Sequence, residues 1–332
     1  MRGVVVREFG GPERLEPTEL PEPTPGQGEI VLAVEAAGVN RADVLARAGK
    51  YHRAGSPPLR LGLEGAGTVV AVADDVTDVA VGQRVLAFGA TNEPGFYAER
   101  VSIAASQTVP VPDEVDSLSA AALPTAWLSA WYTLKTLARL EAGETVLVHA
   151  GASGVGSAAV QIAVDAGATV IATAGSPEKR EWVESLGAHH VLDSRGPTSA
   201  ERVRQVLDLT GSKGADVVLD TVGGAIFSES LLVAGNAGRV IAMANVALEP
   251  STIDTRDFYP KNIRIFGFQI TALKEDGYDP RPDLRELLAG LAEGRFSVPI
   301  DATYDLAEAG KAHAHLEDRS IRGKVLLTAG EQ

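Results

Sequence analysis

The segment HAGASGVG at 149–156 is the part of the chain best suited to hold a phosphate group. It follows an apolar run, TVLVHA, and precedes the helical pattern VGSAAVQIAVDAG. Against the pattern G-x-G-x-x-G, Gly151 and Gly156 match, and Ser153 replaces the middle glycine. Such a turn brings backbone N–H groups to a pyrophosphate at a helix start, although an ordinary strand-to-helix turn remains the alternative. The predicted phosphate contacts are Ser153, Gly154, Val155 and Gly156.

A second segment, ATAGSPEKR at 172–180, bears on which dinucleotide would bind. NAD sites usually carry an acidic residue here for the ribose hydroxyls, and this chain has Gly175 and Ser176, followed by Lys179. Hydroxyl and cationic groups suit a 2′-phosphate, so we predict NADPH rather than NADH. Two alternatives remain: Lys179 is a solvated helix residue, and the nearby Glu178 opposes the phosphate unless it faces solvent.

These segments need a scaffold of alternating strands and helices. Apolar runs predict strands at 145–150, 169–174, 190–194, 215–222 and 239–244, with an edge strand at 263–270. Helical segments separate the runs, and the runs are apolar on both faces. This rhythm is typical of a doubly wound parallel sheet in an α/β fold.

The chain outside this region has a different texture. Short apolar runs at 29–40, 67–73, 82–88 and 97–104 are separated by glycine and proline, which predicts antiparallel strands in a sandwich or barrel. Strand-like segments of the same kind return at 301–306 and 324–328. We therefore predict a discontinuous strand-rich domain, 1–122 plus 296–332, around a nucleotide-binding domain at 123–295.

Composition excludes several classes of function. The 332 residues contain 30 Lys and Arg against 44 Asp and Glu, so the net charge of −14 disfavours nucleic acids and anionic membranes. Cysteine is absent, which excludes disulfides, thiolate metal sites and cysteine nucleophiles. Glycine and polar residues interrupt the uncharged stretch 145–164, so it does not predict a membrane span. We expect a cytoplasmic protein.

Several segments together resemble a known family. They are AAGVNRADVLARAGKY at 36–51, LGLEGAGTVV at 61–70, LPTAWLSAWYTL at 123–134, the glycine-rich turn, GADVVLDTVGG at 214–224 and RGKVLL at 322–327. In this order they resemble the medium-chain dehydrogenase/reductases, in particular the zinc-free quinone oxidoreductase, or zeta-crystallin-like, branch. The resemblance implies a GroES-like catalytic domain and a Rossmann NADPH-binding domain.

The resemblance also implies chemistry without zinc. Asn40 stands where zinc enzymes of the superfamily carry a cysteine ligand, and Leu63 stands where they carry a histidine. Neither side chain replaces those ligands, so no metal site is expected. Without a Lewis acid the expected reaction is hydride transfer from NADPH to a small quinone or an α,β-unsaturated carbonyl.

Further site residues follow from the resemblance. Asn40 is the expected donor to the acceptor oxygen or the nicotinamide ribose, and Tyr51 is the second catalytic candidate. The alternatives are a helix-start residue for Asn40 and an exposed turn aromatic for Tyr51. Asp43 is expected to bond backbone. The remaining expected cofactor contacts are Asn40, Ser129, Ser194, Val222, Asn245, Phe268 and Lys324.

Other interpretations remain open. One is an enoyl reductase that acts on thioester-bound acyl chains, as in polyketide enoyl reductase modules. Another is a protein that binds NADPH with little turnover. The apolar edge strand at 263–270 favours a homodimer, since exposed edges are hazardous unless paired. His313 and His315 are two positions apart on a predicted helix, so they cannot share a metal, and we expect both to face solvent.

Overall fold

The computed structural model describes residues 1–90 and 93–330 of the chain. Two compact units emerge from the packing. The first is formed by Met1–Leu128 together with Lys274–Gln332, and the second by Ser129–Leu273. The domain ranges derived above from sequence texture stay predictions. In the described residues no helix is long and apolar enough to cross a membrane.

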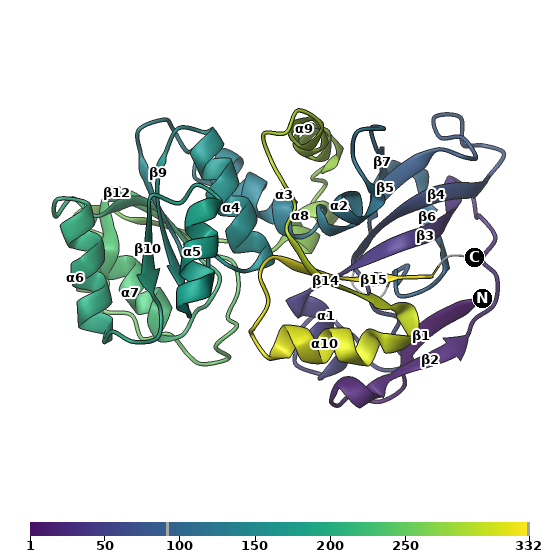
Figure 1. Cartoon of the computed structure of the whole chain (residues 1–332), viewed down its shortest axis with the longest axis horizontal. Helices are drawn as coiled ribbons and strands as arrows, with labels where there is room; N and C mark the ends of the chain where they lie inside the picture. The colour runs from purple at the N-terminus through teal and green to yellow at the C-terminus, as the bar shows by residue number, and fades with distance from the viewer. Residues whose placement is uncertain (91–92, 331–332) are drawn as a thin grey trace. The chain divides into compact units, whose positions relative to one another are not determined.

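The second unit contains a parallel sheet of six strands, in the order β10-β9-β8-β11-β12-β13. Helices α4 and α5 lie on one side of the strands and α6 and α7 on the other, which is the doubly wound plan (Figure 1). The strands are β8 (Thr145–Val148), β9 (Thr169–Ala174), β10 (His190–Asp193), β11 (Ala215–Asp220), β12 (Ala234–Ala242) and β13 (Arg264–Gly267). The helices are α4 (Gly154–Asp165), α5 (Pro177–Ser185), α6 (Ser199–Leu209) and α7 (Ala225–Val233).

The order of these strands reverses between β8 and β11. From β8 the chain moves outward through β9 and β10, and it then returns to place β11 on the other side of β8. Ligands of open α/β sheets bind beyond the carboxyl ends of the strands at such a reversal. The glycine-rich turn follows β8, and Val222 follows β11, so both lie at this end of the sheet.

The first unit is built on a second sheet, with the order β14-β15-β3-β4-β5-β7 and with β6 also paired to β3. Its pairs are antiparallel, as predicted, except that β14 and β15 run parallel. The strands are β3 (Glu29–Val39), β4 (Glu64–Val72), β5 (Arg84–Phe88), β6 (Arg100–Ala104), β7 (Thr108–Pro110), β14 (Ile300–Asp305) and β15 (Lys324–Thr328). A separate antiparallel pair is formed by β1 (Arg2–Val6) and β2 (Leu15–Glu19).

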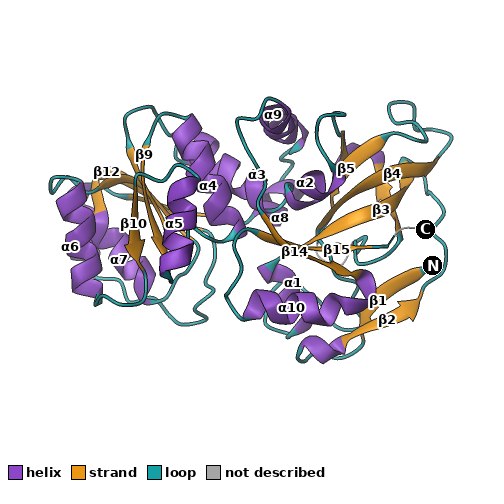
Figure 2. Cartoon of the chain, in the orientation of Figure 1, coloured by secondary structure: helices purple, strands orange, loops and turns teal. Residues whose placement is uncertain are grey.

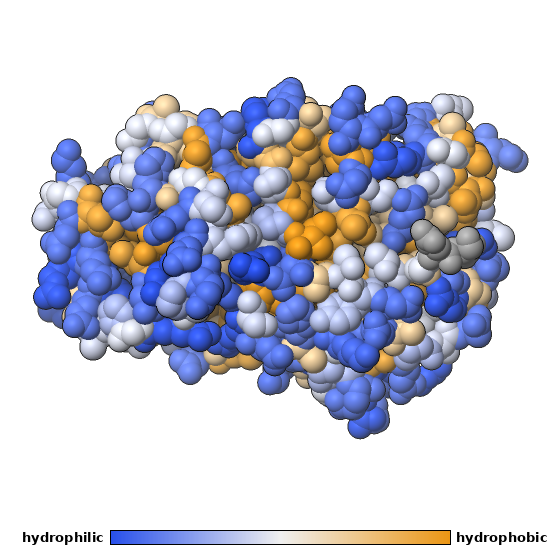
Figure 3. Space-filling model, viewed as in Figure 1, coloured by the Kyte–Doolittle hydropathy of each residue, from blue (hydrophilic) through white to orange (hydrophobic). Residues whose placement is uncertain are grey.

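Helices complete the first unit, as Figure 2 shows in purple. They are α1 (Arg41–Arg47), α2 (Ser117–Ala122), α9 (Arg281–Ala292) and α10 (Ala309–Glu317). Two further helices, α3 (Ala126–Trp131) and α8 (Ile270–Glu275), each begin in one unit and end in the other. The face of the molecule in Figure 3 is mostly hydrophilic with scattered apolar groups, in keeping with the charge content.

Strand register in the first unit brings three strand ends together. Val325 of β15 pairs with Val39 of β3, so Lys324 lies beside the residue that follows β3, which is Asn40. Gly65 of β4 pairs with Ala37 of β3, so Glu64 lies beside Gly38. The sheet therefore gathers one amide, one carboxylate and one ammonium group from distant parts of the sequence.

Candidate functional site

Asn40, Glu64 and Lys324 form a buried polar triangle in the first unit. The Lys324 ammonium lies 2.6 Å from Glu64 Oε1 and 2.6 Å from Asn40 Oδ1. Asn40 Nδ2 donates to the same Glu64 oxygen at 2.7 Å. The exposed fractions are 0% for Glu64, 4% for Lys324 and 9% for Asn40. Water therefore does little to screen the ion pair, and the amide is held by both partners.

Glycine makes room for Glu64 in this triangle. A Cβ atom added to Gly38 would fall 2.1 Å from Glu64 Oε1, so a side chain at position 38 would displace the carboxylate. The second carboxylate oxygen, Oε2, accepts from the backbone N–H of Thr125 at 2.5 Å. Both oxygens of Glu64 thus have donors, which is the condition for burying a carboxylate without a large penalty.

Asp43 fixes the backbone around Asn40. Its carboxylate accepts from the backbone N–H of Asn40 at 2.9 Å and from that of Gly62 at 3.1 Å. The bond to Asn40 closes a capping box at the start of α1. Burial raises the pKa of Asp43 to about 6, and the two backbone N–H donors oppose that rise. Asp43 has the backbone-bonding role expected from the sequence.

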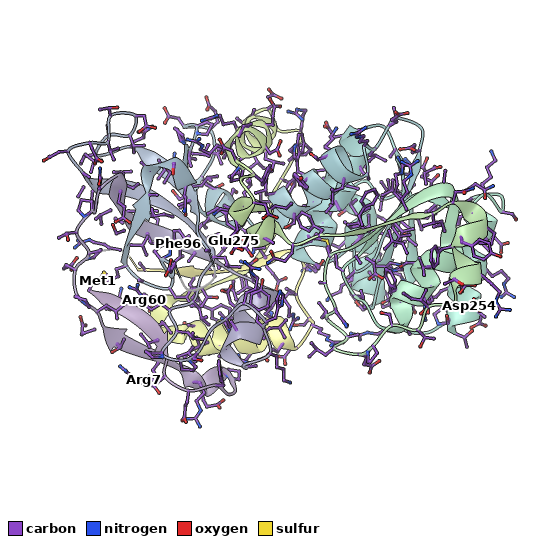
Figure 4. The ribbon with its side chains drawn as sticks, turned by 180° about the vertical axis from the view of Figure 1, so that it is seen from behind. Met1, Arg7, Arg60, Phe96, Asp254 and Glu275 are labelled. Atoms are coloured by element: carbon purple, nitrogen blue, oxygen red, sulfur yellow. The ribbon has the colours of Figure 1, made fainter. Side chains whose placement is uncertain are left out.

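Gly62 is held from a second side. Its φ of +101° suits glycine, and a Cβ there would lie 2.8 Å from the backbone nitrogen of Phe96. Phe96 is labelled in Figure 4 and belongs to the core of the first unit. The loop that leads into Glu64 is therefore closely packed.

A hydrogen-bonded chain continues from Asp43 to α10. Tyr97 bonds to Asp43, and burial raises the pKa of Tyr97 well above its usual value. Its hydroxyl lies 3.0 Å from His313 Nε2, and Arg47 Nη1 lies 3.4 Å from His313 Nδ1. His313 is fully buried at 0% exposure, so the prediction that it faces solvent is wrong. Burial lowers the pKa of His313 to about 3, with the charges of Arg47 and Arg41 adding to the effect.

His315 lies on the same helix and is partly exposed. Its side chain is 25% accessible, and Tyr304 and Asp301 contact its two ring nitrogens. It is therefore less solvated than the sequence suggested. Alternation on α10 places one histidine in the core and the other near the surface.

Tyr51, the second catalytic candidate, lies in the turn after α1. Its ring centroid is 5.1 Å from that of His52, and its half-buried side chain packs against the core of the first unit. The structure gives it a packing role and leaves its part in chemistry as a prediction.

In the second unit the glycine-rich turn starts α4. Ser153 is the N-cap, and its Oγ accepts from the Gly156 N–H at 3.0 Å. A Cβ on Gly156 would lie 2.2 Å from the carbonyl oxygen of Ala150, so only glycine permits this close packing. The first N–H groups of a helix, here Gly154 and Val155, have no acceptor within it. The turn therefore offers two N–H donors and the spare hydrogen of the Ser153 hydroxyl, which fits a pyrophosphate.

Four predicted cofactor residues lie near the end of β9, namely Gly175, Ser176, Lys179 and Ser194. Ser176 caps α5, and its Oγ accepts from the Lys179 N–H at 3.3 Å. Ser194 joins them because its N–H donates to the carbonyl oxygen of Ala174, next to Gly175, at 3.1 Å. Ser176, like Ser153, is an N-cap that accepts from the helix.

Two charged residues complete this group. The Arg195 guanidinium covers Gly175 so closely that a Cβ there would lie 2.7 Å from its Nε. Glu178 brings a negative charge to the same group. Its own backbone N–H and then the Ser176 hydroxyl bond to its carboxyl and hold the pKa of that carboxyl below the usual value. The carboxylate therefore lies at the start of α5 beside Ser176. Glu178 is exposed to solvent, and it still lies close enough to Ser176 to share a hydrogen bond with it.

The other predicted cofactor residues of the second unit lie on neighbouring segments. Asp220 Oδ1 accepts from the Val222 N–H at 2.8 Å, which shapes the turn after β11. Asn245 is close by, since a Cβ on Gly223 would lie 2.8 Å from its Oδ1. The Phe268 ring lies 5.8 Å from that of Tyr132. Ser129 is buried on α3, and its carbonyl oxygen accepts from Thr133 Oγ1 at 2.8 Å.

Sequence reasoning missed two residues of these groups. Glu64 carries a signal, because it is a lone acid in the apolar segment LGLEGAGTVV, where an unpaired charge would be costly. Arg195 follows a predicted residue directly, and its position over Gly175 depends on the pairing of β9 with β10.

Comparison with known proteins places the chain in a family. Residues 26–113 match the family described as "Alcohol dehydrogenase GroES-like domain", and residues 154–290 match "Zinc-binding dehydrogenase". The quinone oxidoreductase of Rattus norvegicus is 32% identical over 330 residues, which cover 98% of this chain and 97% of the rat protein. The chain belongs to the quinone oxidoreductase family. This family lies within the medium-chain dehydrogenase/reductases, as the sequence resemblance predicted.

A second relative is similar along nearly the whole chain. A phthioceranic/hydroxyphthioceranic acid synthase of Mycobacterium tuberculosis is 34% identical over 97% of this chain. The chain spans only 15% of the length of that synthase.

Solved structures agree with the family. A mycobacterial protein complexed with NADPH matches with a TM-score of 0.91 and 34% identity over 99% of this chain and 100% of that one. The CurK enoyl reductase matches with a TM-score of 0.87 and 28% identity over 98% of each chain. The GroES-like and Rossmann folds predicted from the sequence are confirmed.

The name of one matching family mentions zinc, and the residues at the expected ligand positions do not supply a zinc site. Asn40 is engaged with Lys324 and Glu64, and Leu63 is a buried apolar residue. Within residues 1–90 and 93–330, no three His, Asp or Glu side chains come together as metal ligands. In this member of the quinone oxidoreductase family, the cation that lies among the oxygens of the polar triangle is the Lys324 ammonium.

Proposed function

We propose that the chain is an NADPH-dependent oxidoreductase that reduces a quinone or an α,β-unsaturated carbonyl. The observation that carries the proposal is the pair of serine-capped helix starts at Ser153 and Ser176. Each serine accepts a hydrogen bond from its helix, and the hydroxyl hydrogen of Ser153 can then serve an anion. The hydroxyl hydrogen of Ser176 bonds to the Glu178 carboxylate, and a bound phosphate would take the place of that carboxylate. The start of α4 at Ser153 suits a pyrophosphate, and the start of α5 at Ser176 suits a 2′-phosphate.

The residues would divide the cofactor between them. The turn at 153–156 would hold the pyrophosphate, while Ser176, Lys179 and Ser194 would hold the 2′-phosphate beside Gly175. Val222, Asn245, Phe268 and Ser129 would line the rest of the binding surface. When bound, NADPH supplies the hydride. The chain then has to orient the acceptor and donate a hydrogen bond to its developing oxyanion.

We propose Asn40 Nδ2 as that donor, because it is the uncharged side-chain donor of the triangle. It would serve the acceptor oxygen or the nicotinamide ribose hydroxyl. Tyr51 would contribute a wall or a second donor. The structural likeness to an NADPH complex and the similarity to the rat quinone oxidoreductase support the NADPH-dependent oxidoreductase.

The test combines binding and turnover. NADPH and NADH are titrated against the protein by quenching of tryptophan fluorescence, and 1,4-benzoquinone and a simple enone are then added separately. We expect tighter NADPH binding and steady oxidation of NADPH with at least one acceptor. Equal or tighter NADH binding would refute the 2′-phosphate site. Stable NADPH in the presence of both acceptors would favour the thioester or binding-only alternatives.

A second candidate function is enoyl reduction of thioester-bound chains. The likeness to the CurK enoyl reductase and to polyketide-type synthases favours it. A crotonyl thioester of pantetheine serves as the discriminating acceptor. A kcat/KM for this thioester well above that of a matched free enone would favour the enoyl reductase over the reductase of quinones and free enones.

We also propose a homodimer in the cytoplasm. The dimer rests on β13, which ends the strand order and exposes 40% of Ile265. Light scattering after gel filtration measures the assembly, and Ile265→Lys is expected to yield monomers. The lack of cysteine is compatible with a reducing cytoplasm, and fractionation of the producing cells tests this assignment.

A further inference from the structure

The hydrogen bonds of the Asn40–Glu64–Lys324 triangle occupy most of the donors and acceptors of these three side chains. Glu64 Oε1 accepts from Lys324 and from Asn40, and Oε2 accepts from Thr125. The ammonium of Lys324 has three hydrogens and three acceptors: Glu64, Asn40 Oδ1 and, more distantly at 3.4 Å, the carbonyl oxygen of Val39. Two hydrogens of the Lys324 ammonium are therefore firmly bonded, and the third is only weakly held.

The same contacts fix the orientation of the Asn40 amide. An ammonium group can only donate, so the atom that faces Lys324 at 2.6 Å must be the amide oxygen. A carboxylate can only accept, so the atom that faces Glu64 at 2.7 Å must be the amide nitrogen. A flipped amide would set donor against donor and acceptor against acceptor. Two opposite charges thus specify one orientation.

One hydrogen of this amide remains. Asn40 Nδ2 carries two hydrogens, and Glu64 takes one of them. In the described part of the chain the second is recorded only against the carbonyl oxygen of Gly38, at 3.4 Å. That distance exceeds the usual range for an N–H···O bond, so this hydrogen is weakly held.

The backbone of Asn40 is fixed independently. Asp43 accepts from its backbone N–H at 2.9 Å, so the residue is held at both main chain and side chain. Burying an ion pair is often no more stabilising than packing apolar residues of the same size. The pair therefore calls for a role beyond stability.

We propose that Glu64 and Lys324 are positioning residues, which hold the Asn40 amide so that its second Nδ2 hydrogen is presented to the acceptor oxygen or the nicotinamide ribose. The inference rests on the proposed function of Asn40. It gives Lys324 an indirect role through Asn40 beside its predicted contact with the cofactor. It also predicts that any small cation which replaces the ammonium will restore the amide orientation.

Chemical rescue tests the proposal. Lys324→Ala leaves the oxygens without their cation, and we expect kcat with the better acceptor to fall on the order of a hundredfold, as for other small misplacements. Methylammonium should recover much of that loss in Lys324→Ala and none in Asn40→Ala/Lys324→Ala. Unchanged kcat in Lys324→Ala, or equal recovery in the double variant, would overturn the proposal.

A second variant covers the case in which Lys324→Ala fails to fold. Glu64→Gln/Lys324→Met removes both charges together and keeps the side-chain volumes, so its thermal unfolding midpoint should stay close to that of the wild type. We expect kcat to fall about as far as in Lys324→Ala, with NADPH Kd unchanged and no response to methylammonium. A kcat equal to wild type would show that the charges do not position Asn40. Glu99→Gln, which breaks the Arg2–Glu99 ion pair elsewhere in the first unit, is the matched control and should turn over normally.

A readout without turnover separates this inference from the proposed function. The side-chain amide of Asn40 gives two proton resonances, which are assigned by their loss in Asn40→Ala. In the wild type we expect two distinct shifts and slow rotation, because one hydrogen bonds to a carboxylate. In Glu64→Gln/Lys324→Met we expect the shift of that bonded hydrogen to move and the rotation to quicken. If the resonances do not differ between the two proteins, the positioning role fails. If they differ and the wild type still oxidises no NADPH, the proposed function fails instead.

Discussion

The Tyr97 hydroxyl lies 3.0 Å from Nε2 of His313, and this contact sets the direction of a buried hydrogen-bonded chain. Arg47 can only donate, so His313 Nδ1 accepts and Nε2 carries the proton. The Tyr97 hydroxyl oxygen accepts a hydrogen bond from His313 Nε2–H, and the Tyr97 hydroxyl donates its own hydrogen to Asp43. Asp43 thus receives three donors, two from backbone and one from Tyr97.

His313 should make the protein sensitive to mild acid. Its folded pKa of about 3 lies below the unfolded value of 6.5, so the unfolded chain takes up the proton first as pH falls. Stability is therefore lost below pH 6.5, by about 2 kcal/mol at pH 5 for this group. Urea unfolding at neutral pH and near pH 5 measures it. In His313→Gln this part of the pH dependence should vanish, and an identical slope in both proteins would contradict the assignment.

Asp43 should have the opposite pH dependence. Its folded pKa of about 6 is above the ordinary 3.8, so the folded state holds the proton more tightly. This group therefore favours folding as pH falls from 6 toward 4, by about 1.4 kcal/mol at pH 5 relative to neutral pH.

Asp43→Asn removes that pH dependence and adds a penalty. The amide has one acceptor oxygen for three donors, which are the N–H groups of Asn40 and Gly62 and the Tyr97 hydroxyl, so at least one buried donor loses its partner, at a cost of about 1–3 kcal/mol. Denaturant midpoints at two pH values measure both effects. Asp116→Asn is the control, because Asp116 caps α2 with an oxygen that asparagine also provides. Equal stability of both variants would show that the Asp43 bonds matter little.

The residues around Gly175 should decide between NADPH and NADH. Lys179→Ala and Arg195→Ala each remove a cation near the 2′-phosphate position, and we expect NADPH Kd to rise about tenfold in each. NADH Kd should stay constant. Glu178→Gln should act in reverse and tighten NADPH, since it removes the competing carboxylate beside Ser176. Parallel titrations with both cofactors measure the ratio, and loss of both affinities together would indicate misfolding of the turn.

Gly156 should not tolerate a methyl group. In Gly156→Ala the new Cβ would meet the carbonyl oxygen of Ala150, at 2.2 Å in the present geometry, so α4 must move away from the turn. We expect NADPH affinity to fall at least tenfold, because the N–H groups of Gly154 and Val155 move with the helix.

A matched glycine supplies the control for that variant. A Cβ on Gly267 in β13 has nothing within 4 Å, so Gly267→Ala should fold with an unchanged unfolding midpoint. Gly156→Ala is expected to unfold at a lower temperature. Wild-type NADPH affinity in Gly156→Ala would mean that the turn is not the pyrophosphate site.

The second unit was the more predictable part of the fold. Its strands are buried on both faces, so each appears as a continuous apolar run, and all six predicted strands are present. Local pairing of Ser153 with Gly156 and of Ser176 with Lys179 follows from helix-start spacing, which a sequence displays directly. The sequence did not show that β12 begins at Ala234, ahead of the predicted 239–244.

Long-range partners were beyond the reach of the sequence. The expectation for His313 failed because a histidine on a short helix gives no sign of Tyr97 or Arg47, which come from distant segments. Glu64 was passed over for the same reason, since its counter-charge lies on the last strand of the sheet. Asn40 was identified through the family resemblance, and the structure adds that its amide is held by Glu64 and Lys324.

The ion pair between Glu64 and Lys324 joins residues 260 positions apart, so it can form only late in the synthesis of the chain. The second unit, whose residues are contiguous, leaves the exit tunnel complete while β15 is still to be translated. Until Lys324 emerges, Glu64 has the N–H donors of Asn40 and Thr125 but no counter-charge, so we expect this corner of the nascent first unit to stay open to water. We therefore expect the first unit to close only after β15 has been synthesised.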